Sequence, residues 1–255
     1  MSLNNKVVIV TGASSGIGAA TCVHFAQNGA HVVAVGRNLE KLQETGRACT
    51  KANLKAKFLL IQADVTKDTQ KIVDKTIEEF GKIDVLVNNA GILASGTILD
   101  SDIQQFDSIM DTNLRAVFKL TKLVIPHLIK SKGNIVNVSS VAGIRSFVNA
   151  LSYCVSKAAL DQFTKCVALE MAPYNVRVNS VNPGVVVTEV HKRAGMDDEA
   201  YAKYLEHSKS THALGRVGNV NEVAPAIAFL ASDAASFITG ALLAIDGGKS
   251  AMCPR

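Results

Sequence analysis

Short apolar runs rich in β-branched residues alternate with longer segments along the whole chain, and this alternation constrains the fold more than any other feature. Several runs are continuously apolar, as expected for parallel strands that helices cover on both faces. The runs predicted as strands are Lys6–Thr11, Ala30–Val35, Lys57–Ala63, Ile83–Val87, Asn134–Ser139, Val176–Val181 and Ala241–Ile245. The segments predicted as helices are 16–28, 39–52, 68–80, 102–131, 152–172 and 221–232. We therefore predict an α/β fold, a doubly wound, seven-stranded parallel sheet in one domain over 1–255.

Composition and charge argue against several classes of protein. Of the 255 residues, 48% are apolar and 19% are charged, which suits a large core and not a disordered chain. No apolar run approaches the roughly 20 residues that span a bilayer, and the net charge of +5 is scattered, so we expect neither a membrane nor a nucleic-acid partner. The five widely spaced cysteines indicate free thiols, and the six histidines lack metal-ligand spacing, so no metal is expected. The N-terminus enters a core-like run without a signal peptide, which favours a cytoplasmic protein.

A glycine-rich turn, Thr11-Gly12-Ala13-Ser14-Ser15-Gly16-Ile17-Gly18, follows the first predicted strand. Ligands of doubly wound sheets bind beyond the carboxyl ends of the strands. Gly12 would allow a tight turn, Gly16 a close approach to phosphate, and Gly18 close packing of the next helix, whose N-terminus favours a pyrophosphate. No Gly-Lys-Ser/Thr follows, so the turn is not a Walker loop. The pattern favours a nucleotide site over a turn without a ligand.

The ends of the second and third strands bear on the choice of cofactor. The second strand ends Gly36-Arg37-Asn38, where NAD-selective folds usually place an acidic residue for the ribose 2′-hydroxyl. Gly36 offers no carboxylate and Arg37 suits a 2′-phosphate, which favours NADP(H); the alternative is an ordinary surface arginine. Asp64-Val65 follows the third strand, and Asp64 could accept from an adenine amino group or cap the next helix.

Further motifs follow the later strands in order. They are Asn88-Asn89-Ala90-Gly91, Ser139-Ser140, Tyr153-Cys154-Val155-Ser156-Lys157, Asn182-Pro183-Gly184 with Thr188, Ile238-Thr239-Gly240 and Asp246-Gly247-Gly248. Together with the glycine turn they resemble the compact single-domain branch of the short-chain dehydrogenase/reductase family, from Lys6 to Gly248. The resemblance implies a Rossmann-type fold and an oxidoreductase that interconverts a carbonyl group and an alcohol with a nicotinamide dinucleotide.

Tyr153 and Lys157 stand one helical turn apart, so their side chains share one helix face. A nearby ammonium favours a phenolate, so we expect Lys157 to lower the pKa of Tyr153 from its ordinary value near 10. The resemblance implies that Tyr153 protonates the carbonyl oxygen, that Ser140 hydrogen-bonds it, and that Lys157 also holds the nicotinamide ribose. Asn113 corresponds to a family residue supporting a water that links Lys157 to solvent. Ser139 is the alternative to Ser140.

The resemblance also implies a set of cofactor contacts. They are Gly12, Ser14, Ser15, Gly16, Ile17, Gly18, Arg37, Asn38, Asp64, Val65, Asn89, Ala90, Gly91, Tyr153, Lys157, Pro183, Gly184, Val186 and Thr188. Family members that use NADP often carry a second basic residue in the glycine turn. This chain has Ser14-Ser15 there, so use of NAD(H) stays open.

The substrate is less well defined. Three segments are expected to wall its pocket: Ile92–Leu99, Val141–Ala150 and a lid at 189–214. Their large apolar residues favour an apolar carbonyl compound over a phosphorylated sugar, although the same residues could pack helices. With the preference for NADP(H), this predicts NADPH-dependent reduction of an apolar ketone, such as a steroid-like ketone or a 3-oxoacyl compound. The alternatives are an NAD-dependent alcohol dehydrogenase of the same family and a non-catalytic NADP-sensing module. Family members commonly pair two long helices across subunits, so we expect a homo-oligomer, a tetramer.

Overall fold

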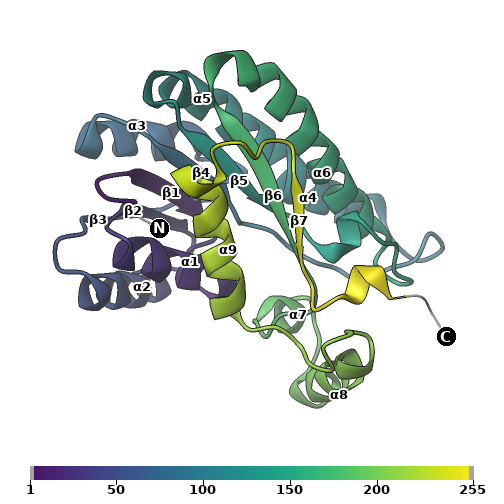
Figure 1. The fold of residues 1–255 in the computed structure, drawn as a ribbon. Coiled ribbons are helices and arrows are strands. Elements are labelled where there is room, and N and C mark those ends of the chain that lie inside the picture. Colours follow the sequence, from purple (N-terminus) through teal and green to yellow (C-terminus); the bar gives the residue numbers. More distant parts are fainter. Residues whose placement is uncertain (1–2, 253–255) are drawn as a thin grey trace.

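Seven parallel strands form one sheet in the computed structural model, which describes residues 3–252. The strands are β1 (Val7–Thr11), β2 (His31–Gly36), β3 (Phe58–Gln62), β4 (Val85–Asn88), β5 (Asn134–Val138), β6 (Arg177–Pro183) and β7 (Leu242–Ile245). Their order is β3-β2-β1-β4-β5-β6-β7, so the chain builds outward from β1 and then crosses back to extend its other side. This confirms the predicted doubly wound, Rossmann-type sheet, and Figure 1 shows helices on both of its faces.

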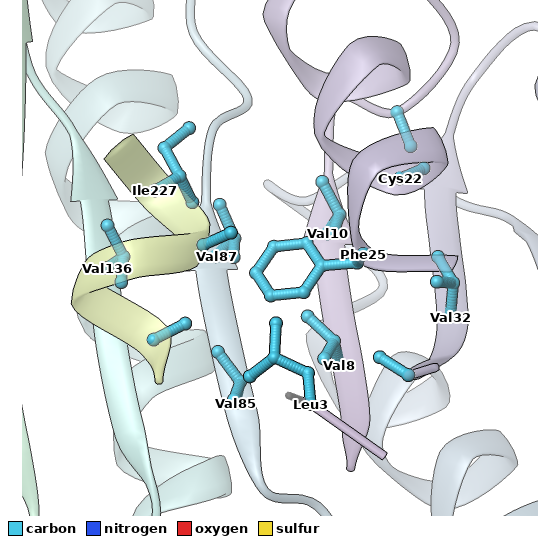
Figure 2. Packing of buried hydrophobic residues seen from close by; sticks show 14 of the residues in the cluster. Leu3, Val8, Val10, Cys22, Phe25, Val32, Val85, Val87, Val136 and Ile227 are labelled. Atoms are coloured by element: carbon cyan, nitrogen blue, oxygen red, sulfur yellow. The ribbon is translucent and has the colours of Figure 1, made fainter. Parts of the chain in front are cut away.

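Helices cover both faces because alternate residues of a strand point to opposite faces. They are α1 (Gly16–Gln27), α2 (Leu39–Ala52), α3 (Thr69–Phe80), α4 (Ile103–Met110), α5 (Ala116–Ser131), α6 (Leu151–Met171), α7 (Val190–Arg193), α8 (Asp198–Ser210) and α9 (Val220–Ala231). Val8 and Val10 of β1 share a core with α1, α2 and α9, whereas Val7 and Ile9 share a second core with α3, α5 and α6. Figure 2 shows the first core, with the ring of Phe25 among valines of β1 and β4. Within residues 3–252, none of these helices combines the length and apolar character that a membrane span requires.

Among the elements that differ from the sequence-based predictions are β6 and the segment 102–131. β6 runs to Pro183, two residues past its predicted end, because its last residues still pair with β7. The segment predicted as one helix over 102–131 is α4 and α5 joined by a π turn, Asp111–Arg115, with Asn113 buried at its centre. A π turn widens the helix locally and often marks a functional site.

Between β6 and α9 the chain leaves the two helix layers. This stretch holds α7 and α8, which Figure 1 shows below the main body of the molecule. A parallel bridge between Val186 and Gly218 closes its base. The stretch contains the predicted lid at 189–214 and starts at the carboxyl end of β6, on the side where such sheets bind ligands.

Candidate active site

A cleft of about 2350 Å³ opens along the carboxyl ends of the strands. Pockets for small molecules usually measure roughly 300–1000 Å³, so this one has room for a dinucleotide and a substrate together. Of the predicted catalytic and cofactor-binding residues, all except Gly18 and Asn113 line it. Residues that follow six different strands are thus brought to one place. Within residues 3–252, no three His, Cys, Asp or Glu side chains gather as metal ligands.

The glycine turn after β1 packs tightly against β4. Gly12 and Gly16 have φ angles of +66° and +56°, in the left-handed region that favours glycine. A Cβ atom on Gly18 would collide with the main-chain oxygen of Gly12. Asn89, after β4, donates from Nδ2 to the main-chain oxygen of Thr11 at 2.8 Å. Gly18 therefore contributes through close packing and does not line the cleft.

The N-terminus of α1 borders the cleft. The Ser15 side chain makes no capping hydrogen bond to the helix, and the first turn carries no acidic side chain. The helix dipole and the first N–H groups are therefore available to an anion. Arg193 of α7 donates from Nη2 to Ser15 Oγ at 2.6 Å, so the predicted lid brings a cation to the same place. The sequence did not point to Arg193, because this contact joins residues 178 apart.

Arg37 and Asp64 lie near each other at the ends of β2 and β3. Asp64 Oδ1 accepts hydrogen bonds from the N and Oγ1 of Thr66 at 2.9 and 2.8 Å. These bonds, with the nearby Arg37, hold the pKa of Asp64 below its usual range. The N-cap of α3 is Asp68, so the alternative in which Asp64 caps that helix is wrong.

Tyr153 and Lys157 lie one turn apart on α6, with Lys157 Nζ 5.7 Å from the centre of the Tyr153 ring. The same Nζ donates to the main-chain oxygen of Val138 at 2.9 Å. Just beyond β5, Ser140 begins a 3-10 helix, and its Oγ accepts from the N of Ala142 at 3.1 Å. The hydroxyl of Ser140 remains able to donate to a substrate.

Removal from water sets the pKa of both titratable groups. Burial raises the pKa of Tyr153 to about 12, and the nearby Ser140 hydroxyl acts in the opposite direction. Burial lowers the pKa of Lys157 to about 8, against the attraction of the Asp161 carboxylate. The expected net lowering of the Tyr153 pKa is therefore wrong, because burial raises this pKa and outweighs the effect of the nearby ammonium. Tyr153 stays protonated at neutral pH, the form that a proton donor needs.

Asn113 lies behind the cleft and is only 1% exposed. Its Oδ1 accepts from the N of Ile92 at 2.9 Å, and its Nδ2 donates to the oxygen of Ile92 at 2.9 Å and to Ser156 Oγ at 3.0 Å. A Cβ on Gly91 would lie 3.3 Å from Asn113 Oδ1 and 3.6 Å from Lys157 Nζ. Asn113 therefore fixes the chain after β4 beside Lys157.

A buried carboxylate behind Ser140 was not anticipated. Asp161, 4% exposed, accepts from Asn182 Nδ2 at 2.8 Å, and Asn182 also donates to the main-chain oxygen of Ser140 at 3.0 Å. Burial raises the pKa of Asp161. Asp161 and Asn182 therefore fix the main chain of Ser140 on the side away from the cleft. Asp161 follows Lys157 by four residues, so the helix-face argument made for Tyr153 could have found it.

All three predicted wall segments contribute to the cleft. Their apolar lining residues are Ile92, Leu93, Val141, Ala142, Phe147, Val148, Ala150, Val190, Met196 and Tyr204. Arg145, His207 and Lys249 line it as well, so the wall is not purely apolar. Lys249 comes from the segment after β7, outside the three predicted segments.

Comparisons with known proteins agree with this fold. A sequence model of the family described as Enoyl-(Acyl carrier protein) reductase matches residues 12–250. The 3-oxoacyl-(acyl-carrier-protein) reductase FabG of Thermotoga maritima is 39% identical over 249 residues, 97% of this chain and 99% of the relative. Meso-2,3-butanediol dehydrogenase of Serratia marcescens is 37% identical over 251 residues, 98% and 97% of the two chains. A solved short-chain dehydrogenase/reductase of unknown function from Caenorhabditis elegans, with cofactor, is 40% identical with a TM-score of 0.90, covering 98% of this chain and 97% of that one.

The chain therefore belongs to the short-chain dehydrogenase/reductase family. It is an oxidoreductase that acts on alcohol or carbonyl groups with a nicotinamide cofactor. The resemblance inferred from the motifs is thus confirmed over nearly the whole chain.

Proposed function

We propose that this protein is an NADPH-dependent ketone reductase, transferring hydride between NADP(H) and a carbonyl or secondary alcohol. The proposal rests on one observation: Tyr153, Ser140 and Lys157 line the same cleft as the glycine turn. A non-catalytic NADP-sensing module would use the turn but would have no need for the three polar groups together.

The residues at the ends of the strands fit a dinucleotide. A Cβ atom at Gly12, Gly16 or Gly18 would press on neighbouring protein atoms, so only glycine lets the main chain pack this closely there, and α1 opens with no acidic side chain. The residues that would hold its two halves are Arg37, Asp64 and Asn89–Gly91 on the adenine side, and Pro183, Gly184, Val186 and Thr188 on the nicotinamide side. When bound, the nicotinamide supplies or accepts the hydride.

In reduction, Tyr153 donates its phenolic proton to the carbonyl oxygen. Ser140 donates a hydrogen bond to the same oxygen as negative charge develops there. The Lys157 ammonium, beside the ring, stabilises the phenolate that remains, and its two other N–H groups are suited to ribose hydroxyls. Asn113 acts as a positioning residue for the main chain next to Lys157. In alcohol oxidation Tyr153 accepts the proton instead.

The end of β2 favours NADP(H). Neither Gly36 nor Asn38 offers a carboxylate to a ribose 2′-hydroxyl, and the exposed Arg37 lines the cleft. A Cβ on Gly36 would lie 3.3 Å from Ser14 Oγ, so the Ser14 hydroxyl is close to the same spot. A 2′-phosphate there would accept charge-assisted hydrogen bonds. The alternative is an NAD-dependent alcohol dehydrogenase, because the glycine turn itself carries no basic residue.

The cleft wall supports a substrate with an apolar body. Two relatives are named for a 3-oxoacyl-(acyl-carrier-protein) and for meso-2,3-butanediol, and a third, from Paraclostridium sordellii, is a 7alpha-hydroxysteroid dehydrogenase. We propose the 189–214 segment as a lid of the single domain, because it lines the cleft and Arg193 bonds to Ser15. The free thiols Cys22, Cys49, Cys154 and Cys166 support a cytoplasmic location.

The test is oxidation of NADPH over a panel of ketones. The panel contains steroid-like ketones, 3-oxoacyl thioesters and small diketones, each paired with the matching alcohol and NADP⁺. We expect turnover with at least one ketone for the wild-type protein and none for the Tyr153→Phe variant. A protein that binds NADPH and turns over no member of the panel in either direction would argue for the sensing module.

A further inference from the structure

Two cations line the substrate side of the cleft, and one of them bonds to the chain next to the other. Arg145 lies in the turn after Ser140, with its main-chain N bonded to the oxygen of Val141 at 2.8 Å. Lys249 lies in the segment after β7, and both side chains line the cleft. We call Arg145 and Lys249, with the Phe147 ring beside the Lys249 ammonium, the cationic corner.

Arg145 is held by a main-chain carbonyl. Its Nε and Nη2 both donate to the oxygen of Ser250, at 2.9 and 2.5 Å. Its Nη1 has no hydrogen-bond partner, and no carboxylate lies within 4.0 Å of the guanidinium, among residues 3–252. The bonds to Ser250 fix the Nε and Nη2 edge of the guanidinium group and leave Nη1 for a ligand.

Lys249 is half-buried and is held by neutral groups. Its Nζ donates to Thr211 Oγ1 at 2.7 Å and lies 5.3 Å from the centre of the Phe147 ring. The nearby Asp246 carboxylate attracts the ammonium without a direct ion pair within 4.0 Å, and its two oxygens accept from the main-chain N of Gly248 and of Ser250. Burial lowers the pKa of Lys249, so its ammonium lacks full compensation for lost water.

Two other cations near the lid form direct ion pairs. Lys203 bonds to Glu199 at 2.6 Å, and Arg216 forms a two-pronged pair with Glu222 at 2.7 and 2.8 Å. Like Arg193, which bonds to Ser15, the two cations of the corner form no direct ion pair within 4.0 Å among residues 3–252. Such a pair, facing a cleft, is suited to an external anion.

The sheet order shows which ligand the corner would meet. The residues for the cofactor's phosphates follow β1 and β2, whereas Arg145 follows β5 and Lys249 follows β7. The corner thus lies on the other half of the sheet, next to Ser140 and the C-terminal end of the lid. An anion bound there belongs to the substrate and not to the dinucleotide.

We propose that Arg145 and Lys249 form a subsite for an anionic group of the substrate, a carboxylate or a phosphate. This inference rests on the proposed ketone reductase and narrows its substrate to a carbonyl compound with an apolar body and an acidic group. The Phe147 ring contacts the apolar body of the substrate. The Arg145 guanidinium and the Lys249 ammonium bind its acidic group.

The test compares three acetophenones: para-acetylbenzoate, its uncharged methyl ester, and para-acetylphenyl phosphate. For the wild-type protein we expect kcat/KM for at least one of the two acids to exceed that for the ester by at least about tenfold, roughly 1.4 kcal/mol. The double variant Arg145→Met with Lys249→Met should bring that ratio close to one and leave the ester within about threefold. The matched control, Lys203→Met with Arg216→Met, removes the same charge from paired residues and should keep the preference.

Binding without turnover separates this inference from the proposed function. Calorimetry with the NADP⁺-loaded protein gives Kd for the same three compounds, and the preferred acid should bind at least about tenfold more tightly than the ester. If that preference is present and lost in the double variant, the subsite stands even where no compound is reduced, which would count against the ketone reductase alone. Equal binding of acids and ester by the wild-type protein, or a preference that survives the double variant, overturns the subsite.

Discussion

Lys157 Nζ donates a 2.9 Å hydrogen bond to the main-chain oxygen of Val138, which ties α6 to the end of β5. Ser140 follows Val138 by two residues, just past the end of β5. Tyr153 lies one turn before Lys157 on α6. One strand end and one helix face therefore position all three groups that the proposed reaction needs. The lysine is fixed by a neutral carbonyl, so its positive charge is not cancelled by a direct ion pair.

The phenolic proton is expected to be essential. Tyr153→Phe removes the acid and keeps the ring, so the variant should fold and bind NADPH with a Kd within about threefold of wild type. Its kcat should fall by at least about 10²-fold, the usual contribution of a positioned acid. Stopped-flow turnover and fluorescence titration of NADPH measure the two quantities. Tyr174→Phe, the same change at an exposed site, should keep full activity; substantial turnover by a folded Tyr153→Phe would refute the mechanism.

The buried Lys157 should make stability depend on pH. Its pKa is about 8 in the folded protein and ordinarily 10.5, so the unfolded chain binds more protons between these values. The buried Lys157 ammonium lowers the free energy of unfolding, and this cost is complete below about pH 8. As pH rises toward 10.5 the cost is relieved, by on the order of 1–3 kcal/mol. Raised pKa values of Tyr153 and Cys49, each about 12, lower stability at high pH.

Comparison with Lys157→Met removes these other contributions, because both proteins share them. Urea unfolding at about pH 7, 9 and 10 should show the free energy of unfolding of the wild-type protein rising relative to that of the variant. A difference that stays constant over this range would mean that Lys157 is not buried as an ammonium.

NADPH should be preferred over NADH by at least about tenfold in kcat/KM. Each charge-assisted bond to a 2′-phosphate is worth on the order of 1.5–3 kcal/mol, and about 1.4 kcal/mol is tenfold. Arg37→Ile should remove most of the preference, and adding Gly36→Asp should reverse it. The new Cβ at Gly36 needs Ser14 and Leu42 to shift by a few tenths of an ångström, so the single variant serves as the control. A natural preference for NADH, or a ratio unchanged by both variants, would place cofactor selection elsewhere.

We expect a homotetramer, because the outer faces of α5 and α6 expose apolar side chains that a second copy could cover. Phe118 on α5 is 53% exposed and Leu169 on α6 is 78% exposed, and the Phe118 ring lies 6.1 Å from that of Phe163. Packing against a second copy would remove these apolar side chains from water. Light scattering at micromolar concentration should give four times the chain mass. Phe118→Glu with Leu169→Glu should lower it, and a monomer mass for the natural protein would contradict the prediction.

The sequence predicted the sheet well because buried parallel strands leave continuous apolar runs, and it located the cleft because ligands bind where those strands end. It did not predict the π turn at Asp111–Arg115, since one wider turn leaves the helical pattern of apolar residues almost unchanged. It also missed the cationic corner. Arg145 and Ser250 are 105 residues apart, and only the folded sheet brings the ends of β5 and β7 together.

The central pair of strands also governs how a newly made chain can fold. β1, β2 and β3 emerge first and pair with one another, but the other edge of β1 pairs with β4, through Val8 with Val85. Until β4 has been synthesised, that edge of β1 exposes unpaired main-chain groups. It also exposes side chains that are buried in the core of the folded protein. Open apolar edges recruit other chains, and pairing between distant segments is slow. We therefore expect the growing N-terminal half to be prone to aggregate.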